Sequence, residues 1–433
     1  MKKYFNKSNM NFFELVINRA FFMVDIIRNK RITRELEFLE EFYGSDEKHN
    51  KQELCFQNLL NDIRHNAPYY KGVNKKLEDF PVITKKQIGD NLNNLVSNKY
   101  NKENLLKVTT SGSFGTPMIF YRNKSKQLRQ IAEVLFFGRD IEYYMGRHHA
   151  FIRGVSKSKL KLFLQNEIHI DPTHLDKESL KNIVSKIRQT RYIIGFPSVI
   201  VSIIEYCEKM AISPDTFDIL GIITTSEPLN SQQRKLIENF FNCTVIARYA
   251  TEELGIIGNQ CVESENYHIN EASFIVEVLK KNIDEPAEED EEGRIVVTDL
   301  YSNAMPLIRY DTGDYGVLGK GCPCGYNGKV LRTISGRKIQ NLLDVNGEEV
   351  SPFSLNVRMK EYNNVYQFQF IQEKHNEYYL NLVVNENYNE EKMILENLHY
   401  ILGEDANIKI HYVEEIEPLP SGKRPYIINK LNS

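Results

Sequence analysis

The sequence predicts an α/β fold, with a large N-terminal domain of helix-covered, mostly parallel sheets and a small α+β C-terminal domain. Strand and helix patterns alternate from residue 150 to 250, paired strands without helices follow residue 255, and a separate set of elements begins near residue 337. A chain of 433 residues is also long for one domain. We therefore expect a division into domains 1–336 and 337–433.

The charge and composition of the chain disfavour some classes of function. The formal net charge is −3, so there is no basic excess of the kind that nucleic-acid partners require. Six cysteines in so long a chain do not make a disulfide scaffold, and they favour a reducing, cytoplasmic location. The chain has no Trp, but 24 Tyr and 23 Phe supply large side chains for cores and pockets.

Residues 12–27 are strongly apolar and lie in a helical N-terminal extension, residues 1–40. Glu14, Arg19 and Asp25 interrupt the stretch, which therefore does not predict a transmembrane span. It also lacks the small-residue cleavage site of a signal peptide. The spacing predicts a helix lying on a surface. That surface is either the protein's own body or, as the alternative, a membrane or a partner, which would make the protein membrane-peripheral.

The chain from residue 35 to 250 gives the following elements. A strand–loop–strand pattern spans 106–121, and alternating elements follow it. Polar residues stand after the strands at 196–198 and 226–228, where open α/β sheets bind ligands. Expected helices are two within 35–67, one beginning at 85, and 125–138, 180–188, 199–210 and 231–241; expected strands are 150–154, 192–195, 220–225 and 244–247.

The C-terminal third shows a different pattern. Strands 274–279 and 294–298 flank an acidic turn, which predicts an antiparallel pair with a solvated loop. Beyond residue 337 the remaining residues suffice for a small α+β domain. Its expected strands are 366–372, 378–384 and 407–412, and its expected helices are 351–362 and 390–402.

Residues 108–121 read VTTSGSFGTPMIFY, which concentrates hydroxyl and glycine residues in one loop. Backbone N–H groups in such a loop can surround an anion, and a polyphosphate is the natural guest. The spacing is not that of a Walker loop, because Thr116 and Pro117 follow Gly115. Taken alone, the stretch is equally consistent with a flexible surface linker.

Four further motifs follow this loop in a fixed order. They are Tyr249–Glu252, the run Arg309–Asp314, Gly336–Arg337, and Ser421–Lys423 near the C-terminus. In this order and spacing the chain resembles the adenylate-forming superfamily of acyl-CoA synthetases. Within it the chain is most similar to the phenylacetate–CoA ligase branch and its CapK-like relatives in capsular polysaccharide biosynthesis. The resemblance runs from the first helices to Lys423.

The resemblance implies an ATP- and Mg²⁺-dependent ligase that joins a carboxylic acid to AMP and then transfers the acyl group. It implies that the C-terminal domain is a mobile lid, which turns about residues 336–339 between the two steps. The implied ATP-binding residues are Thr109, Thr110, Ser111, Gly112, Ser113, Gly115 and Thr116 around the phosphates, Ser226, Glu227 and Pro228 beside the adenine, Tyr249 against the base, and Asp314 and Arg337 at the ribose.

Three residues carry the implied catalytic roles. Thr251 would reach the α-phosphate, Glu252 would bind Mg²⁺ with the phosphate oxygens, and Lys423 would contact the acyl carboxylate and the bridging oxygen. The structural alternatives are a surface carboxylate at a helix start for Glu252, a turn residue for Asp314 and an exposed lysine for Lys423. The chain departs from the family pattern at three places. In the loop, Met118 stands where many members have lysine, and at the hinge Lys338 to Gln340 lack the usual acidic residue. The third departure is minor, because Ala250 replaces a common glycine.

A second constellation combines Cys261, His268, Cys322 and Cys324. Three thiols and an imidazole are a tetrahedral Zn²⁺ set, and four protein ligands would make the site structural. The alternative is a group of free cytosolic thiols in turns. Candidates for the acyl pocket are Tyr144, His148, His149, Phe196 and Ser198, whose alternative is ordinary packing.

Three functions therefore remain open on the sequence. The leading function is an acid–thiol ligase, whose substrate is a small-molecule carboxylic acid and whose acceptor is CoA. The second is an amide ligase that acylates an amine on a sugar or amino acid. The third, from another class, is a non-catalytic nucleotide-binding or membrane-associated scaffold, which the full set of Glu252, Asp314 and Lys423 disfavours.

Overall fold

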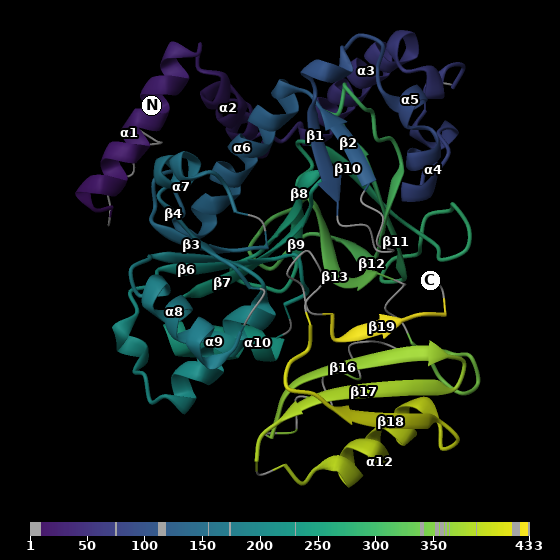
Figure 1. The fold of residues 1–433 in the computed structure, drawn as a ribbon. Helices are drawn as coiled ribbons and strands as arrows, with labels where there is room; N and C mark the ends of the chain where they lie inside the picture. Colours follow the sequence, from purple (N-terminus) through teal and green to yellow (C-terminus); the bar gives the residue numbers. More distant parts are fainter. Residues whose placement is uncertain are drawn as a thin grey trace. The chain divides into compact units, whose positions relative to one another are not determined.

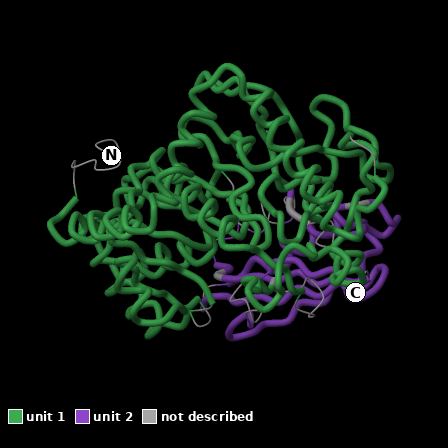
Figure 2. Tube along the Cα trace, turned by 90° about the horizontal axis from the view of Figure 1, so that it is seen from above, with its two compact units in different colours: residues 1–334 green, residues 335–433 purple. Residues whose placement is uncertain are grey.

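The structure is a computed structural model, and its chain divides into two compact units, residues 1–334 and 335–433 (Figure 2). Each unit has its own buried apolar core. The structure describes residues 10–73, 76–110, 118–154, 156–172, 175–229, 231–337, 342–350, 355, 359, 362, 364–386, 388–417 and 425–431, and at 110, 336, 337, 349 and 366 it describes the backbone alone.

An eleven-stranded sheet organises unit 1, and five neighbouring strands of it are parallel. Helices connect these strands, because a parallel pair needs a crossover. Helices α8, α9 and α10 lie together along one side of them and bury Ile183, Ile203 and Ile237 (Figure 1). The bounds are β3 His149–Ile152, α7 Lys159–Gln165, β4 Glu167–Ile170, α8 Lys177–Ile187, β5 Tyr192–Gly195, α9 Pro197–Lys209, β6 Gly221–Thr225, α10 Ser231–Phe241 and β7 Thr244–Thr251.

The other strands of this sheet continue from β7 in antiparallel pairs. The predicted α/β class is confirmed, and so is the antiparallel pairing of strands 274–279 and 294–298, whereas the parallel arrangement is confined to β3–β7. The sheet order is β10-β11-β12-β13-β9-β8-β7-β6-β5-β3-β4. The bounds are β8 Gly255–Gln260, β9 Tyr267–Ile269, β10 Phe274–Leu279, β11 Glu292–Asp299, β12 Tyr310–Lys320 and β13 Lys329–Arg337.

A separate antiparallel hairpin confirms the predicted strand–loop–strand pattern. It consists of β1 (Leu106–Thr110) and β2 (Met118–Arg122), with Val108 opposite Phe120. Both of these residues are buried in the same core as the antiparallel strands. The hairpin is therefore fixed against the large sheet, and it holds the two ends of the loop between them.

The N-terminal helices include the one predicted over residues 12–27. Helix α2 packs on α6 through Leu36, Leu39 and Leu135. No helix among the described residues is long and apolar enough to span a bilayer. The helix bounds are α1 Phe12–Ile27, α2 Arg31–Tyr43, α3 Lys48–Asn66, α4 Lys85–Asp90, α5 Leu92–Leu95 and α6 Lys124–Gly138.

Unit 2 is a four-stranded sheet, ordered β18-β17-β16-β19, with one described helix packed on it. Ile394 and Leu398 of α12 enter the same core as Leu380 of β17. The predicted helix 351–362 lies mostly outside the described residues. The bounds are β14 Leu342–Leu343, β15 Glu349–Val350, β16 Val365–Lys374, β17 Glu377–Val384, α12 Glu391–Leu402, β18 Asn407–Tyr412 and β19 Ile427–Asn429.

Candidate active site

The carboxyl ends of β5, β6 and β7 bring three predicted segments together. These strands are parallel and in register, with Gly195 opposite Thr224 and Thr225 opposite Arg248, so the residues after each strand leave the same edge of the sheet. The Glu227 carboxylate accepts a 3.2 Å hydrogen bond from the backbone N–H of Ser198, which joins two of these segments directly. Phe196, Ser198, Ser226, Glu227 and Pro228 therefore share one edge.

Ser226, directly after β6, has φ of 71°. This left-handed conformation is uncommon for a residue with a Cβ atom, and it recurs at ligand sites that the surrounding structure holds in place. The turn reverses the chain at the sheet edge and directs Glu227 toward Ser198. The predicted adenine-side segment is thus a fixed turn.

Tyr249 links β7 to β12. Its hydroxyl donates to Asp314 Oδ2 over 2.9 Å and to Thr312 Oγ1 over 3.2 Å. Three strands lie between β7 and β12 in the sheet order, so the sheet must curve for these side chains to meet. Burial, and then the charge of Asp314, raise the pKa of the Tyr249 hydroxyl well above its ordinary value, which keeps it a neutral donor. Asp314 itself remains partly exposed.

The turn after β7 holds two carboxylates in contrasting environments. Glu253 is buried, where it accepts a 2.7 Å hydrogen bond from the Tyr310 hydroxyl and lies 3.3 Å from Lys85 Nζ. Glu252 is exposed. Thr251 Oγ1 accepts a 3.2 Å hydrogen bond from the Leu254 N–H, which tightens the turn. Glu253 thus anchors the turn and leaves Glu252 open to solvent.

Two arginine side chains, Arg122 and Arg153, interact electrostatically with the exposed Glu252. Burial lowers the pKa of the Arg122 and Arg153 guanidinium groups, and the charge of Glu252 opposes this in both. Arg122 also donates to the Gln130 side chain, whose Nε2 donates to Leu254 O over 3.0 Å. Hairpin strand β2, helix α6 and the turn after β7 are therefore connected around one carboxylate.

Gly255 follows this turn and has φ of +95°. A Cβ atom added there would come within 2.8 Å of Gln130 Nε2. The backbone conformation therefore favours glycine at this position.

The glycine and hydroxyl loop is described only at its ends. Thr109 is an exposed residue of β1 paired with Ile119, and the backbone of Thr110 pairs with Met118. Phe120 of β2 packs on Tyr310, with ring centroids 6.3 Å apart, so the loop begins and ends beside β12. Arg337 ends β13, and its side chain is not described. Outside the described residues lie Ser111, Gly112, Ser113, Gly115, Thr116 and Lys423.

The structure separates the five candidate acyl-pocket residues. His149 begins β3 and pairs with Tyr192 at the start of β5, whereas Phe196 and Ser198 follow the end of β5. Four residues of strand, about 13 Å, separate Tyr192 from Phe196. Tyr144 and His148 precede β3 on the same side as His149. Phe196 and Ser198 therefore share an edge with the turn after β7, and the other three candidates do not.

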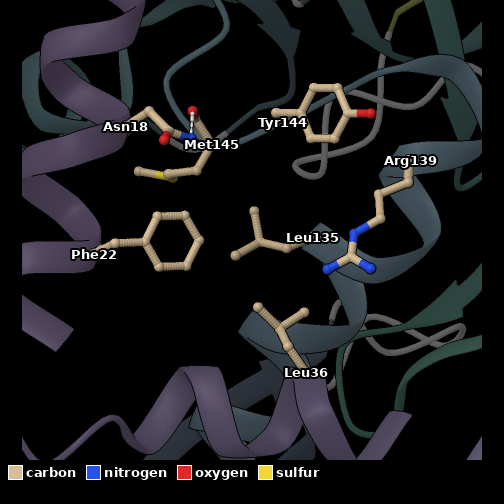
Figure 3. Close-up of a pocket in the computed structure, with 7 residues that line it drawn as sticks. All are labelled: Asn18, Phe22, Leu36, Leu135, Arg139, Tyr144 and Met145. Carbon is tan, nitrogen blue, oxygen red and sulfur yellow. Dashed lines mark hydrogen bonds between the residues drawn. The ribbon is translucent and has the colours of Figure 1, made fainter. Parts of the chain in front are cut away.

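Two of the three remaining candidates, His149 and Tyr144, have other surroundings in the structure. The His149 ring nitrogen lies 2.9 Å from Arg147 O and the ring is 3.4 Å from Glu167. The Glu167 carboxylate also accepts from Lys157 over 2.8 Å and from Arg153. Burial alone would raise its pKa, but these hydrogen bonds and cations lower it to about 2. Tyr144 lines a cavity of about 10 Å³ against α1, which has no room for an acyl chain (Figure 3).

Lys85, Arg122 and Tyr310 were not predicted from the sequence. Lys85 lies far from the motifs, Arg122 directly follows the loop motif at the end of β2, and neither residue type carries a signal of its own. Tyr310 lies inside the run Arg309–Asp314, so its position next to a predicted ligand could have indicated a role.

The predicted metal ligands do form one cluster. The ligand atoms of Cys261, His268, Cys322 and Cys324 all lie within 4.8 Å of one another. Strand β9, which carries His268 and has three residues, lies between β8 and β13, and Ser264 Oγ of the β8–β9 turn lies 3.1 Å from Cys322 Sγ of the β12–β13 turn. Bonds of 2.3 Å from a tetrahedral Zn²⁺ would place two thiolates about 3.8 Å apart, so the spacing fits such an ion. The His268 ring stacks on Tyr326, 4.4 Å between centroids, which fixes its orientation.

Comparison with known proteins gives matches along most of the chain. A family model described as the CapK C-terminal domain matches residues 342–430. Protein CapK of Staphylococcus aureus is 28% identical over 435 residues, which cover 93% of each chain. Phenylacetate-coenzyme A ligase of Thermus thermophilus is 32% identical over 162 residues, 36% of each chain.

Solved structures of similar fold include a 2-hydroxyisobutyryl-CoA ligase in the postadenylation state, in complex with its acyl-AMP. Its TM-score is 0.71 and its identity 16%, and the match covers 87% of this chain and 88% of that one. An anthranilate CoA ligase in complex with anthranoyl-AMP has a TM-score of 0.54 at 12% identity, covering 76% of this chain and 67% of that one. At these identities the structural matches establish the fold.

Proposed function

We propose that the chain is a member of the adenylate-forming superfamily, in its CapK-like branch, and that it is an ATP-dependent ligase that activates a carboxylic acid and transfers the acyl group to CoA. The observation that carries the proposal is the meeting of Tyr249 and Asp314 beside the exposed Glu252. A hydroxyl acceptor, an aromatic ring and a free carboxylate at one sheet edge suit the ribose, base and metal-bound phosphates of ATP.

The first step would join the acid to AMP. A carboxylate oxygen of the acid attacks the α-phosphorus of ATP, a new P–O bond forms, and the bond to the β-phosphate oxygen breaks, which releases pyrophosphate. Asp314 would accept hydrogen bonds from the ribose hydroxyls, and its bond from Tyr249 orients it. Thr251 ends β7, directly before the turn that would face the α-phosphate. We assign Lys423 and Arg337 to the same step from their motifs.

The loop from Thr109 to Thr116 would hold the terminal phosphates. Backbone N–H groups and hydroxyls there would act as donors that neutralise charge as pyrophosphate leaves. Support comes from the position of its ends, which lie beside β12 through the packing of Phe120 on Tyr310. We include Ser226, Glu227 and Pro228 on the adenine side, and Phe196 and Ser198 on the acyl side of the same edge.

Mg²⁺ would be held by Glu252 together with phosphate oxygens. The residues fit this ion, because a single exposed carboxylate near a phosphate site is a usual Mg²⁺ arrangement. When bound, the ion neutralises phosphate charge. Buried Glu253 is already committed to Tyr310 and Lys85, so it positions the turn instead.

The second step would transfer the acyl group to CoA. The thiol sulfur forms a bond to the acyl carbon, the bond from that carbon to the phosphate oxygen of AMP breaks, AMP leaves and the thiol proton passes to solvent. We propose that residues 337–433 act as a domain that turns about residues 336–339 between the steps. An amine on a sugar or amino acid is the alternative acceptor, and the similarity to CapK supports it only weakly.

We also propose a structural Zn²⁺ at Cys261, His268, Cys322 and Cys324, supported by their clustering. A cytoplasmic location accords with six cysteines of which none is in a disulfide. We retain contact of residues 12–27 with a membrane or partner, because apolar side chains of α1 face solvent.

The test is pyrophosphate release from ATP and Mg²⁺ with a panel of aryl, hydroxy, fatty and amino acids. We expect release that depends on one class of acid, followed by thioester formation when CoA is added. Release followed by amide formation with an amine, and no thioester, would move the acceptor to the alternative. No release with any acid together with no ATP binding would leave the scaffold function.

A further inference from the structure

Helix α1 buries three of its polar side chains and exposes most of its large apolar ones. Glu14, Asn18 and Asp25 are 0%, 2% and 4% exposed, whereas Phe12, Met23 and Ile27 are 83%, 63% and 78% exposed. The two sets recur at helical spacing on opposite faces. This reverses the usual arrangement, in which a surface helix turns its apolar face to the protein.

Hydrogen bonds fix the helix in this orientation. Glu14 completes a capping box with Asn11 and accepts from the His148 N–H over 2.9 Å. Asn18 Nδ2 donates to Met145 O over 2.8 Å, beside the core residue Phe22 (Figure 3). Rolling the helix to hide its apolar face would break these hydrogen bonds and take away the present partners of the His148 N–H and the Met145 carbonyl. The exposure of the apolar face is therefore built into the packing.

The buried carboxylate of Asp25, at the other end of α1, also holds the helix in this orientation. Asp25 accepts from the N–H groups of Ile32 and Thr33 at 2.9 Å each, and from the Thr33 hydroxyl at 2.7 Å. These donors belong to the first turn of α2, where the free N–H groups of a helix favour an anion. Helix α1 is thus tied to the body at both of its ends and in its middle.

Helix α7 extends the exposed apolar face. Leu160 and Phe163 are 67% and 61% exposed, and the ring of Phe163 lies edge-on to that of Phe13, 6.0 Å between centroids. Figure 1 shows the two helices on the same side of unit 1. We call the exposed apolar side chains of the two helices the α1–α7 surface, which consists of Phe12, Phe13, Met23, Ile27, Leu160 and Phe163.

Every exposed charge on these two helices is positive. Structure is described for all residues of α1 and α7, and the exposed charged ones are Arg19, Lys159 and Lys161. The two carboxylates of α1 are the buried ones described above. Exposed Arg28 and Lys30 directly follow α1. The apolar surface therefore carries cations and no exposed anion.

We propose that the α1–α7 surface binds the interface of an anionic lipid bilayer, with the helices lying in the membrane plane. Apolar rings would enter the boundary between headgroups and acyl chains, and the cations would contact lipid phosphates. Lys159 and Lys161 suit this position, because long side chains can extend from an apolar face to the headgroups. The proposal is independent of the ligase activity.

The test is sedimentation of the full chain with vesicles of phosphatidylcholine alone and of phosphatidylcholine mixed with phosphatidylglycerol. We expect binding to the mixed vesicles that weakens as salt is added. Met23→Ser with Phe163→Ser should weaken it about tenfold or more, because apolar area drives insertion. The double variant Lys159→Glu/Lys161→Glu should bind the mixed vesicles less tightly than the wild type does, with no change toward vesicles of phosphatidylcholine alone.

Met210→Ser, at a 42% exposed methionine on another part of unit 1, is the matched control and should bind as the wild type does. Circular dichroism verifies that each variant is folded. Equal binding by the Met23/Phe163 variant and the wild type would overturn the proposal. Concentration-dependent self-association that this variant abolishes, without vesicle binding by the wild type, would assign the surface to a second copy of the chain.

Discussion

Tyr249 Oη lies 2.9 Å from Asp314 Oδ2, although three strands stand between β7 and β12 in the sheet. The curvature that brings them together creates the edge at which ATP is proposed to bind. Two kinds of substitution at this pair should differ in effect. Replacing Asp314 removes the proposed nucleotide ligand itself, whereas replacing Tyr249 removes only the hydrogen bond that orients Asp314.

Asp314→Asn should weaken ATP binding about tenfold to a hundredfold. A hydrogen bond to a charged group contributes about 1.5–3 kcal/mol, and 1.4 kcal/mol is a factor of ten. Tyr249→Phe keeps the carboxylate and loses only its restraint, so its effect should be smaller. Calorimetric titration with ATP measures both. An Asp314→Asn variant that binds ATP as tightly as the wild type would remove Asp314 from the nucleotide site.

Lys423→Ala should reduce adenylate formation about a hundredfold or more, because a single positioned donor at the developing charge has an effect of this size. Thioester formation from preformed acyl adenylate should change little, since that charge is no longer present. Pyrophosphate release and product formation from synthetic adenylate separate the two steps. Equal losses in both would contradict the role assigned to this lysine.

The purified protein should contain one zinc per chain, measured by elemental analysis. Cys324→Ser should lose the metal and lower the midpoint of thermal unfolding, because the ion joins two turns of the sheet. Cys55→Ser, in helix α3 away from the cluster, is the control and should keep the metal. Metal-free wild-type protein with an unchanged unfolding midpoint after zinc addition would exclude a structural zinc.

Glu167→Gln should destabilise the protein at neutral pH. The pKa of Glu167 is lowered to about 2 from an ordinary value of 4.5, so the ionised form stabilises the fold above pH 4.5 and this contribution is lost as the pH falls toward 2. Urea unfolding at several pH values should show a constant difference from the wild type above about pH 5 that shrinks below it. Glu37→Gln, at an exposed residue of α2, should show no such dependence.

The sequence was sufficient for the elements whose cause is local. The alternation of apolar residues predicts β5, β6 and α9, and the strand–loop–strand pattern predicts β1 and β2, because each depends on its own periodicity. Short elements with weak patterns, such as β4 and α7, were not predicted. Phe196 and Ser198, which follow β5, were placed correctly at the end of a strand because the point at which the apolar strand pattern stops can be identified in the sequence.

The features that the sequence did not reveal depend on distant contacts. Grouping His149 with Phe196 required knowing which end of β3 faces which end of β5, and residue type does not carry that information. The roles of Lys85 and Tyr310 in holding Glu253 arise from elements more than 50 residues from it. The exposed apolar face of α1 also required the partners of Glu14 and Asn18, since the periodicity alone predicts the apolar side to be the buried one.

Strand β7 is parallel to β6 and antiparallel to β8, so in unit 1 it joins the two halves of the sheet. Its residues Val245 and Ile246 are fully buried and pair with Ile222 and Ile223 of β6. Their amide hydrogens should exchange with solvent deuterium only when the whole unit opens, whereas those of the turn at 251–253 can exchange through local opening. Amide exchange within β7 therefore reports on global unfolding, whereas amide exchange in the turn that follows it reports on occupancy of the site.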